Sequence, residues 1–153
     1  MRVRRARVED AGGIARVFVR AWQVAYRGLV PDRILAGLSV ERRRARWRER
    51  LGGGDCTFVV QDHGIAGYCR IVPPDIVADL YVLPERRHGG VGSALLEAGL
   101  DELRSHSADA SLWVFADNLP ARAFCARFGF APDGAERVDE ATGLTEIRLG
   151  ARL

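Results

Sequence analysis

The sequence contains no lysine, because each of its 23 basic residues is an arginine. A P-loop ends in Gly-Lys-Ser/Thr, whose lysine reaches the phosphates, so this absence excludes that class of nucleotide site. Long apolar runs are missing too. No run approaches the ~18–20 residues that a membrane span needs. The basic N-terminus is not followed by the apolar stretch of a secretory signal. We therefore expect no association with a membrane.

Cysteine is also scarce. Cys56, Cys69 and Cys125 are odd in number and widely spaced. They form no Cys-x-x-Cys pair, and no histidine stands at a ligand spacing from them, so we expect neither a disulfide framework nor a metal site. Free thiols favour a reducing cytoplasm as the compartment.

The remaining composition is typical of a globular protein. The chain has 153 residues, of which 48% are apolar and 28% charged. A chain of this length buries roughly 68–70% of its surface on folding, which is enough for a substantial core. No repeat or low-complexity linker interrupts it, so we expect a single domain over residues 1–153.

Arginines gather between residues 42 and 50, where Glu41 and Glu49 flank or interleave with them. The formal net charge is only +3. We interpret this cluster as a solvated helix face rather than a stripe that follows phosphates, and we expect no nucleic-acid partner. An arginine-rich nucleic-acid binder is the competing hypothesis, and it predicts steeply salt-dependent binding.

Apolar spacing predicts a mixed order of helices and strands. Helices are predicted at residues 9–26, near 34–35, and at 39–51, 91–104 and 119–128. Strands are predicted at residues 56–61, 65–72, 76–83, 111–116 and 144–153. The order α-α-β-β-β-α-β-α-β predicts an α/β (α+β) domain with a mixed sheet. Its front is antiparallel, and it has one strand–helix–strand crossover.

Residues 84–96, PERRHGGVGSALL, join a strand end, a glycine-rich turn and a helix start. Amides at a helix N-terminus are unpaired and favour anions, and glycine lets a phosphate approach closely. A dinucleotide fingerprint does not fit, since Leu95 stands where the third small residue belongs. The turn also follows a late strand rather than opening a βαβ unit.

Two segments carry a resemblance to a known family. The turn Arg87-His88-Gly89-Gly90-Val91-Gly92 follows Leu80-Tyr81-Val82-Leu83-Pro84 and has the pattern R-x-x-G-x-G. Downstream, Asn118, Ala121 and Phe124 precede Phe128-Gly129-Phe130. These segments resemble motif A and the N-x-x-A-x-x-F-Y-x-x-x-G-F segment of the GNAT N-acetyltransferase superfamily. The resemblance spans nearly the whole chain and is strongest from about residue 79 to residue 130. It implies the GNAT fold, a central, mostly antiparallel sheet with a splayed parallel strand pair, flanked by helices.

The resemblance implies acetyl-CoA as the acyl donor, held where strands 76–83 and 111–116 splay apart. It implies direct attack on the thioester by a primary amine of a small molecule or peptide, and family members often form homodimers. The residues implied to bind the cofactor are Leu80, Tyr81, Val82, Arg87, His88, Gly89, Gly90, Val91, Gly92, Ser93, Asn118 and Phe124.

The catalytic residues are expected on the strand and helix beside this loop. Asp79 is the expected base, with Asp75 in reserve, although Asp79 could equally anchor the substrate amine or be a surface carboxylate. The family's usual acid is a tyrosine at the position of Cys125. A thiol with a reference pKa of ~8.5 is able to protonate a leaving thiolate. One alternative is that Cys125 only packs and that water or another group supplies the proton. Another is a route through a covalent acyl-cysteine.

Trp22 and Tyr26 lie where the family's helix–loop–helix covers the acceptor. Aromatic residues at helical spacing are more often core residues, so we expect Trp22 to be partly core and Tyr26 to contact the substrate. The missing tyrosine motivates a second function, a catalytically inactive acyl-CoA-binding module.

Overall fold

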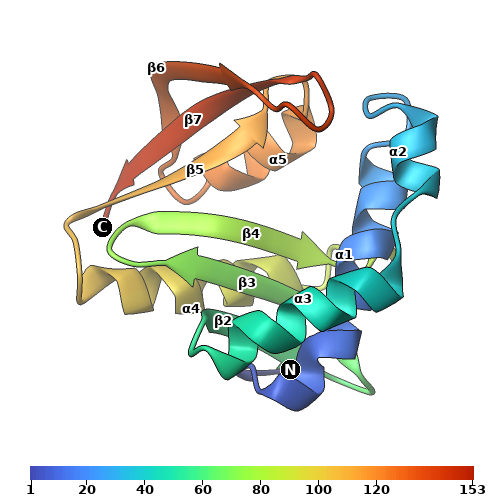
Figure 1. The fold of residues 1–153 in the computed structure, drawn as a ribbon. Coiled ribbons are helices and arrows are strands. Elements are labelled where there is room, and N and C mark those ends of the chain that lie inside the picture. The colour runs from blue at the N-terminus through green and yellow to red at the C-terminus, as the bar shows by residue number, and fades with distance from the viewer.

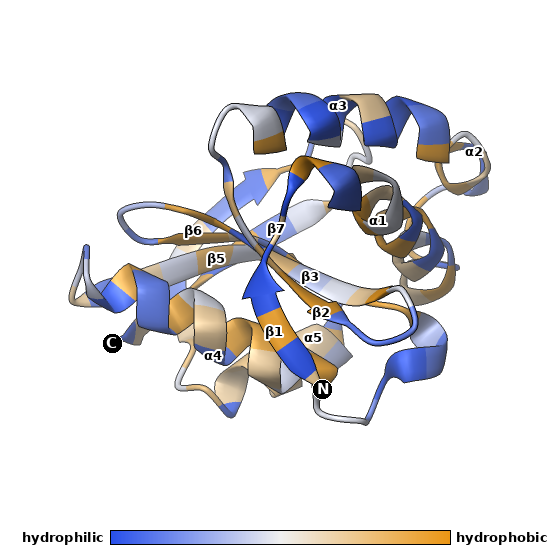
Figure 2. Cartoon of the chain, turned by 90° about the horizontal axis from the view of Figure 1, so that it is seen from below, coloured by the Kyte–Doolittle hydropathy of each residue, from blue (hydrophilic) through white to orange (hydrophobic).

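The computed structural model describes residues 1–153 as three layers, with a seven-stranded sheet between two layers of helices (Figures 1 and 2). The strands are β1 (Arg2–Arg5), β2 (Cys56–Gln61), β3 (Ile65–Val72), β4 (Ile76–Val82), β5 (Asp109–Phe115), β6 (Ala131–Val138) and β7 (Thr145–Arg152). The helices are α1 (Ala11–Ala25), α2 (Asp32–Ala36), α3 (Val40–Gly52), α4 (Val91–Arg104) and α5 (Leu119–Ala126). Two short 3-10 helices, η1 (Val8–Asp10) and η2 (Pro84–Arg86), precede α1 and the glycine-rich loop.

Helices α1 and α3 cover one face of the sheet, and α4 and α5 cover the other (Figure 2). On the first face, Trp47 of α3 is 1% exposed and packs edge-on against Tyr68 of β3, with ring centroids 5.1 Å apart. On the second face, Leu95 and Leu103 of α4 are fully buried against β3 and its neighbours. Burying one such side chain contributes about 1.5–3 kcal/mol, so both helix layers are held mainly by apolar packing.

The local sequence explains where the longer helices begin. The side chain of Ser39 accepts a hydrogen bond from the amide of Arg42 at 3.2 Å, which caps α3. Asn118 caps α5 in the same way, accepting from the amide of Ala121 at 3.3 Å. Helix α4 has no side-chain cap, and it begins after Gly90, whose backbone is left-handed with φ of 84°.

The sheet is antiparallel except at one junction. In the order β1-β2-β3-β4-β5-β7-β6, only β4 and β5 are parallel, and they pair at a single position, Ile76 with Ser111. Beyond that position the two strands diverge toward their carboxyl ends (Figure 1). The expected mixed sheet with a splayed parallel pair flanked by helices is therefore confirmed.

Two strands were not predicted from the sequence. The chain Arg2–Arg5 forms edge strand β1, and Ala131–Val138 forms the opposite edge strand β6. Strand β6 contains Pro132 and Gly134, residues that are tolerated on an edge because a missing N–H or a bulge costs little there. No helix of the chain combines the length and the apolar character that crossing a membrane requires.

Candidate active site

The glycine-rich loop forms an anion cradle at the start of α4. His88 and Gly90 both have positive φ, 64° and 84°, and this turns successive amides toward one side. The amides of residues 88–93 donate to no acceptor among the hydrogen bonds outside regular elements. Val91, Gly92 and Ser93 are the first residues of α4, so they have no intrahelical acceptor. The loop therefore presents a run of unpaired donors.

This cradle fits a pyrophosphate. The first turn of α4 carries no acidic side chain that would repel an anion, and the helix dipole is positive at this end. A Cβ at Gly92 would lie 3.4 Å from the Phe124 ring, at ordinary van der Waals contact, so α4 approaches α5 closely at Gly92. Phe124 thus links the two sequence motifs in space. Arg87 and His88 lie beside the cradle with exposed side chains.

The splayed edge of β4 adds further donors. Leu83 donates its amide to the carbonyl of Ala66 on β3 at 2.9 Å. Because backbone groups alternate along a strand, the amide of Tyr81 also faces β3. The amides of Leu80 and Val82 face the other way, into the splay. Strand β5 does not pair with β4 at either position.

Asp79 lies on the face of β4 that α1 and α3 cover, opposite Arg70 of β3. Its side chain is half-buried and takes part in no hydrogen bond or ion pair within the chain. Burial raises the pKa of Asp79 above the ordinary aspartate value, and the charges of Arg70 and Arg50 oppose that rise. A carboxylate with a raised pKa is a better proton acceptor than an exposed one.

Asp75, the reserve candidate for the base, lies at the closed end of the parallel pair. It stands in the turn before β4, and its carbonyl accepts a hydrogen bond from the amide of Ser111 at 2.8 Å. The structure thus separates the two aspartates, with Asp79 in the splayed part of β4 and Asp75 outside it.

Cys125 is buried in the core between α5 and the sheet. Burial raises the pKa of its thiol to about 11. The thiol is therefore protonated at neutral pH, but it is a weaker acid than an ordinary thiol.

Tyr26 lies at the end of α1 and is only 7% exposed. Its hydroxyl lies 3.4 Å from that of Tyr81. Burial raises the pKa of Tyr26, and its polar neighbours Tyr81 and Asn118 oppose the rise. Tyr26 therefore connects the helical cover with both strands' ends, because Tyr81 belongs to β4 and Asn118 follows β5.

Trp22 is part of the aromatic packing beside Tyr26. Its ring stacks on Phe18 at 5.0 Å and meets Tyr26 edge-on at 4.8 Å. The indole N–H is buried and has no hydrogen-bond partner.

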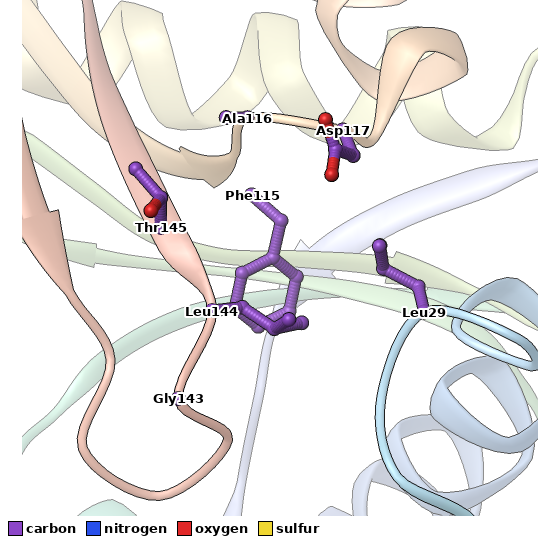
Figure 3. A pocket seen from close by; sticks show the side chains of 7 residues that line it. All are labelled: Leu29, Phe115, Ala116, Asp117, Gly143, Leu144 and Thr145. Carbon is purple, nitrogen blue, oxygen red and sulfur yellow. The ribbon is translucent and has the colours of Figure 1, made fainter.

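The structure also shows a cavity that no sequence motif marks. It has a volume of about 430 Å³ and lies where β5 ends (Figure 3). Phe115 of β5 packs with Leu144 of the β6–β7 connection, and Leu29 reaches the same cluster from the α1–α2 connection. The lining residues are Leu29, Phe115, Ala116, Asp117, Gly143, Leu144 and Thr145. The only indication of this cavity in the sequence is that Phe115 and its neighbours stand at the end of a predicted parallel strand. Sites in open sheets gather at the carboxyl ends of such strands.

Arg43 and Arg50 form a second set of residues that sequence reasoning missed. Both were assigned to a solvated helix face, yet their side chains are half-buried, whereas Arg42, Arg46 and Arg48 are exposed. The one-sided burial follows from the helical period, since Arg43 and Arg50 stand four residues before and three after the buried Trp47.

Comparison with known proteins agrees with this geometry. The acetyltransferase (GNAT) family profile matches residues 18–130. YuaI of Bacillus subtilis, described as an uncharacterized N-acetyltransferase, is 30% identical over 128 residues, which cover 76% of this chain and 72% of that protein. The chain therefore belongs to the acetyltransferase (GNAT) family.

Solved structures share the fold at low sequence identity. A GCN5-related N-acetyltransferase from Rhodopseudomonas palustris superimposes with a TM-score of 0.82 at 22% identity, covering 99% of this chain and 95% of the other. The PaiA N-acetyltransferase from Thermoplasma acidophilum, solved in complex with coenzyme A, gives a TM-score of 0.78 at 17% identity. That match covers 99% of this chain and 98% of PaiA. The fold is thus the GNAT fold.

Proposed function

We propose that residues 1–153 act as one N-acetyltransferase domain, which moves an acetyl group from acetyl-CoA to a primary amine of a small molecule or peptide. One observation carries the proposal: the unpaired amides of residues 88–93 lie directly beyond the splayed end of β4, the strand that also bears Asp79. Membership of the family and the structure of PaiA with coenzyme A support the choice of donor.

The chain's own groups divide the binding of the donor between them. We assign the pyrophosphate to the unpaired amides of residues 88–93, with the Ser93 hydroxyl as a further donor. The Arg87 amide already donates to the Pro84 carbonyl at 3.4 Å. The amides of Leu80 and Val82 are assigned to the pantetheine arm of acetyl-CoA. Its own amide groups would then hydrogen-bond along β4 as an added strand does. The Asn118 oxygen already caps α5, so its side-chain N–H₂ is the group left for the ligand. Phe124 closes the far side.

Bound acetyl-CoA supplies an activated acyl group as a thioester. In our proposal, Asp79 takes the proton from the acceptor amine, and its raised pKa suits that task. A backbone N–H of the splayed β4 edge polarises the carbonyl, as in an oxyanion site. Trp22 and Tyr26 form the cover under which the acceptor lies.

A proton must also reach the leaving thiolate. We consider two candidate donors that hold a proton at neutral pH, the Cys125 thiol and the Tyr26 hydroxyl. The Cys125 thiol, with a pKa of about 11, would transfer its proton uphill to a thiolate of ordinary basicity. Tyr26, whose pKa burial also raises above the ordinary tyrosine value, is the second candidate because its hydroxyl has polar neighbours in Tyr81 and Asn118.

The experiment is to incubate the protein with acetyl-CoA and a panel of amines and to measure the release of free thiol. Amine-dependent release supports the proposal. The competing function is an inactive acyl-CoA-binding module, which the replacement of the family's tyrosine by Cys125 favours. Tight coenzyme A binding without turnover of any amine would establish that module instead.

A further inference from the structure

The inner face of α3 carries two arginines with no acceptor. The other partly buried arginines each donate to a carboxylate or a carbonyl of the chain: Arg4 to Asp10, Arg70 to Asp55, Arg86 to Asp62, Arg122 to the Ala116 carbonyl and Arg148 to Asp133. The side chains of Arg43 and Arg50 make no hydrogen bond and no ion pair, although both are half-buried. Arginines withdrawn from water without a partner are unusual, because burial of a charge is costly.

Arg43 is held in place by an aromatic ring. Its guanidinium carbon lies 3.9 Å from the centroid of the Phe18 ring on α1. A guanidinium stacked in this way keeps its N–H edges available for an acceptor in its own plane. Arg50 similarly lies over the Trp47 ring, 5.1 Å from its centroid. Burial lowers the pKa of both arginines, so each would gain from an anionic neighbour.

A third donor without an acceptor lies beside them. The hydroxyl of Tyr68 on β3 is completely buried and has no hydrogen-bond partner. The charges of Arg43 and Arg50 both act on it. Buried polar groups are almost always paired, so this region of the fold is short of acceptors.

The side chains around Asp79 also carry more positive than negative charge. Three arginines, Arg43, Arg50 and Arg70, act on it, against one further carboxylate, Asp55, which already accepts from Arg70 at 2.9 Å. A simple cationic amine approaching Asp79 would be repelled by this excess of positive charge. An acceptor that also carries an anion would be attracted by it.

We propose that Arg43 and Arg50 form a subsite for a carboxylate of the acceptor. The acceptor class is then an amine that carries its own carboxylate, such as a free amino acid, rather than a polyamine. This inference rests on the proposed N-acetyltransferase function and on Asp79 as the group that receives the amine. Arginine is suited to the role because its planar fork matches a carboxylate with two parallel hydrogen bonds.

Matched acceptors test the subsite directly. Alanine and alaninamide, and glutamate and glutamine, differ mainly in one negative charge, and spermidine represents the polyamines. We expect at least one carboxylate member to be used with a kcat/KM about tenfold or more above that of its amide, and spermidine to be the poorest acceptor. Equal use of both members of every pair, or preferred use of spermidine, would overturn the subsite.

Variants of α3 identify the residues responsible. Arg43→Met keeps an unbranched stem but removes the charged guanidinium, and Arg43→Lys keeps the charge but removes the fork. We expect Arg43→Met to raise KM for the carboxylate acceptor about tenfold or more, and not to raise KM for the amide, since the variant removes a positive charge that repels a plain amine. Arg43→Lys should lie between the two. Arg46→Met, on the exposed side of the same helix, is the matched control and should match the unmodified protein. An equal change for both acceptors in Arg43→Met would point to a structural role and contradict the subsite.

A binding measurement separates this inference from the proposed function. Calorimetry with glutarate and with glutaramide, in the presence of coenzyme A, needs no turnover. Binding of glutarate that Arg43→Met weakens supports the subsite even if no amine is acetylated. Absence of glutarate binding overturns the subsite even if other amines are acetylated and the proposed function stands.

Discussion

The hydroxyl of Tyr26, in the turn after α1, lies 3.4 Å from the hydroxyl of Tyr81 in β4. This contact joins the helical cover to the strand whose edge faces the splay. Phe115, the last residue of β5, packs edge-on against the Tyr26 ring at 5.1 Å. Tyr26 therefore touches both strands that diverge, and its hydroxyl is placed between them and the covering helix.

The two candidate proton donors are separated by Tyr26→Phe and Cys125→Ala. Because the Tyr26 hydroxyl has polar neighbours and the Cys125 thiol lies in apolar surroundings, we expect the larger effect in Tyr26→Phe. Its kcat should fall by about 100-fold, the lower range for loss of an acid or base. The kcat of Cys125→Ala should fall by less than about threefold. Single-turnover kinetics at saturating acetyl-CoA measures both, and the reverse order of effects would assign the role to Cys125.

Asp79→Asn should lower kcat/KM by about 10²–10⁴, the usual contribution of a general base. The affinity for coenzyme A should not change. In the unmodified protein the rate should rise with pH through the pKa of Asp79, which burial places above the ordinary value of 3.8. That acidic limb of the pH–rate profile should disappear in the variant. Asp75→Asn is the control, and a loss of activity there instead would make Asp75 the base.

The same substitution should stabilise the fold at neutral pH. Asp79 has a higher pKa in the folded chain than in the unfolded one, so the folded state binds more protons between those two values. Its contribution to stability is therefore fully present below the unfolded pKa and is lost as pH rises through the folded pKa. Asp79→Asn removes this loss, so its free energy of unfolding should exceed that of the unmodified protein at pH 7. Urea denaturation at pH 4 and pH 7 measures the difference, with the exposed Glu97→Gln as control. An unchanged or lower stability of Asp79→Asn at pH 7 would contradict the assigned burial effect.

Gly90→Ala should weaken coenzyme A binding by about tenfold or more. A Cβ at a left-handed position costs about 1–2 kcal/mol and pushes the cradle amides out of line. Gly54→Ala is a matched control, since Gly54 has the same φ of +84° and no other atom near its Cβ position. Calorimetric titration with coenzyme A should show a loss only for Gly90→Ala, whereas both variants should lose similar thermal stability. Equal affinities for coenzyme A in the two variants would show that the loop is not part of the coenzyme A site.

The sequence was sufficient for the parts of the fold that follow from local patterns. Periodicity predicted the longer helices and the central strands, and the glycine-rich turn predicted where α4 begins, at Val91. The edge strand β6 was not predictable in this way. Its sequence APDGAERV has neither alternation nor β-branched enrichment, and it pairs with β7 across a register shift between Pro132 and Glu136.

The sequence predicts candidate positions where residues would act through the backbone, as at Leu80 and in the glycine loop, since motif spacing fixes such positions. The site was less predictable where side chains from distant segments meet. The proximity of Tyr26 and Tyr81 depends on a separation of 55 residues along the chain. The inward orientation of Arg43 depends on which side of α3 packs on the sheet, and the weak apolar stripe of that helix did not reveal it.

The single paired position between β4 and β5 divides the sheet into two panels, one of four strands and one of three. A continuous ladder would tie these panels with a backbone hydrogen bond at nearly every residue, but here the seam is held by packing on either side and by one junction near Ile76. It is consequently the most compliant line in the sheet. A molecule that hydrogen-bonds along the free edge of β4 and also contacts α5 would bridge the two parts of the sheet and stiffen the junction between them. The amide protons of Leu80 and Val82 would then record its presence as slowed exchange with solvent.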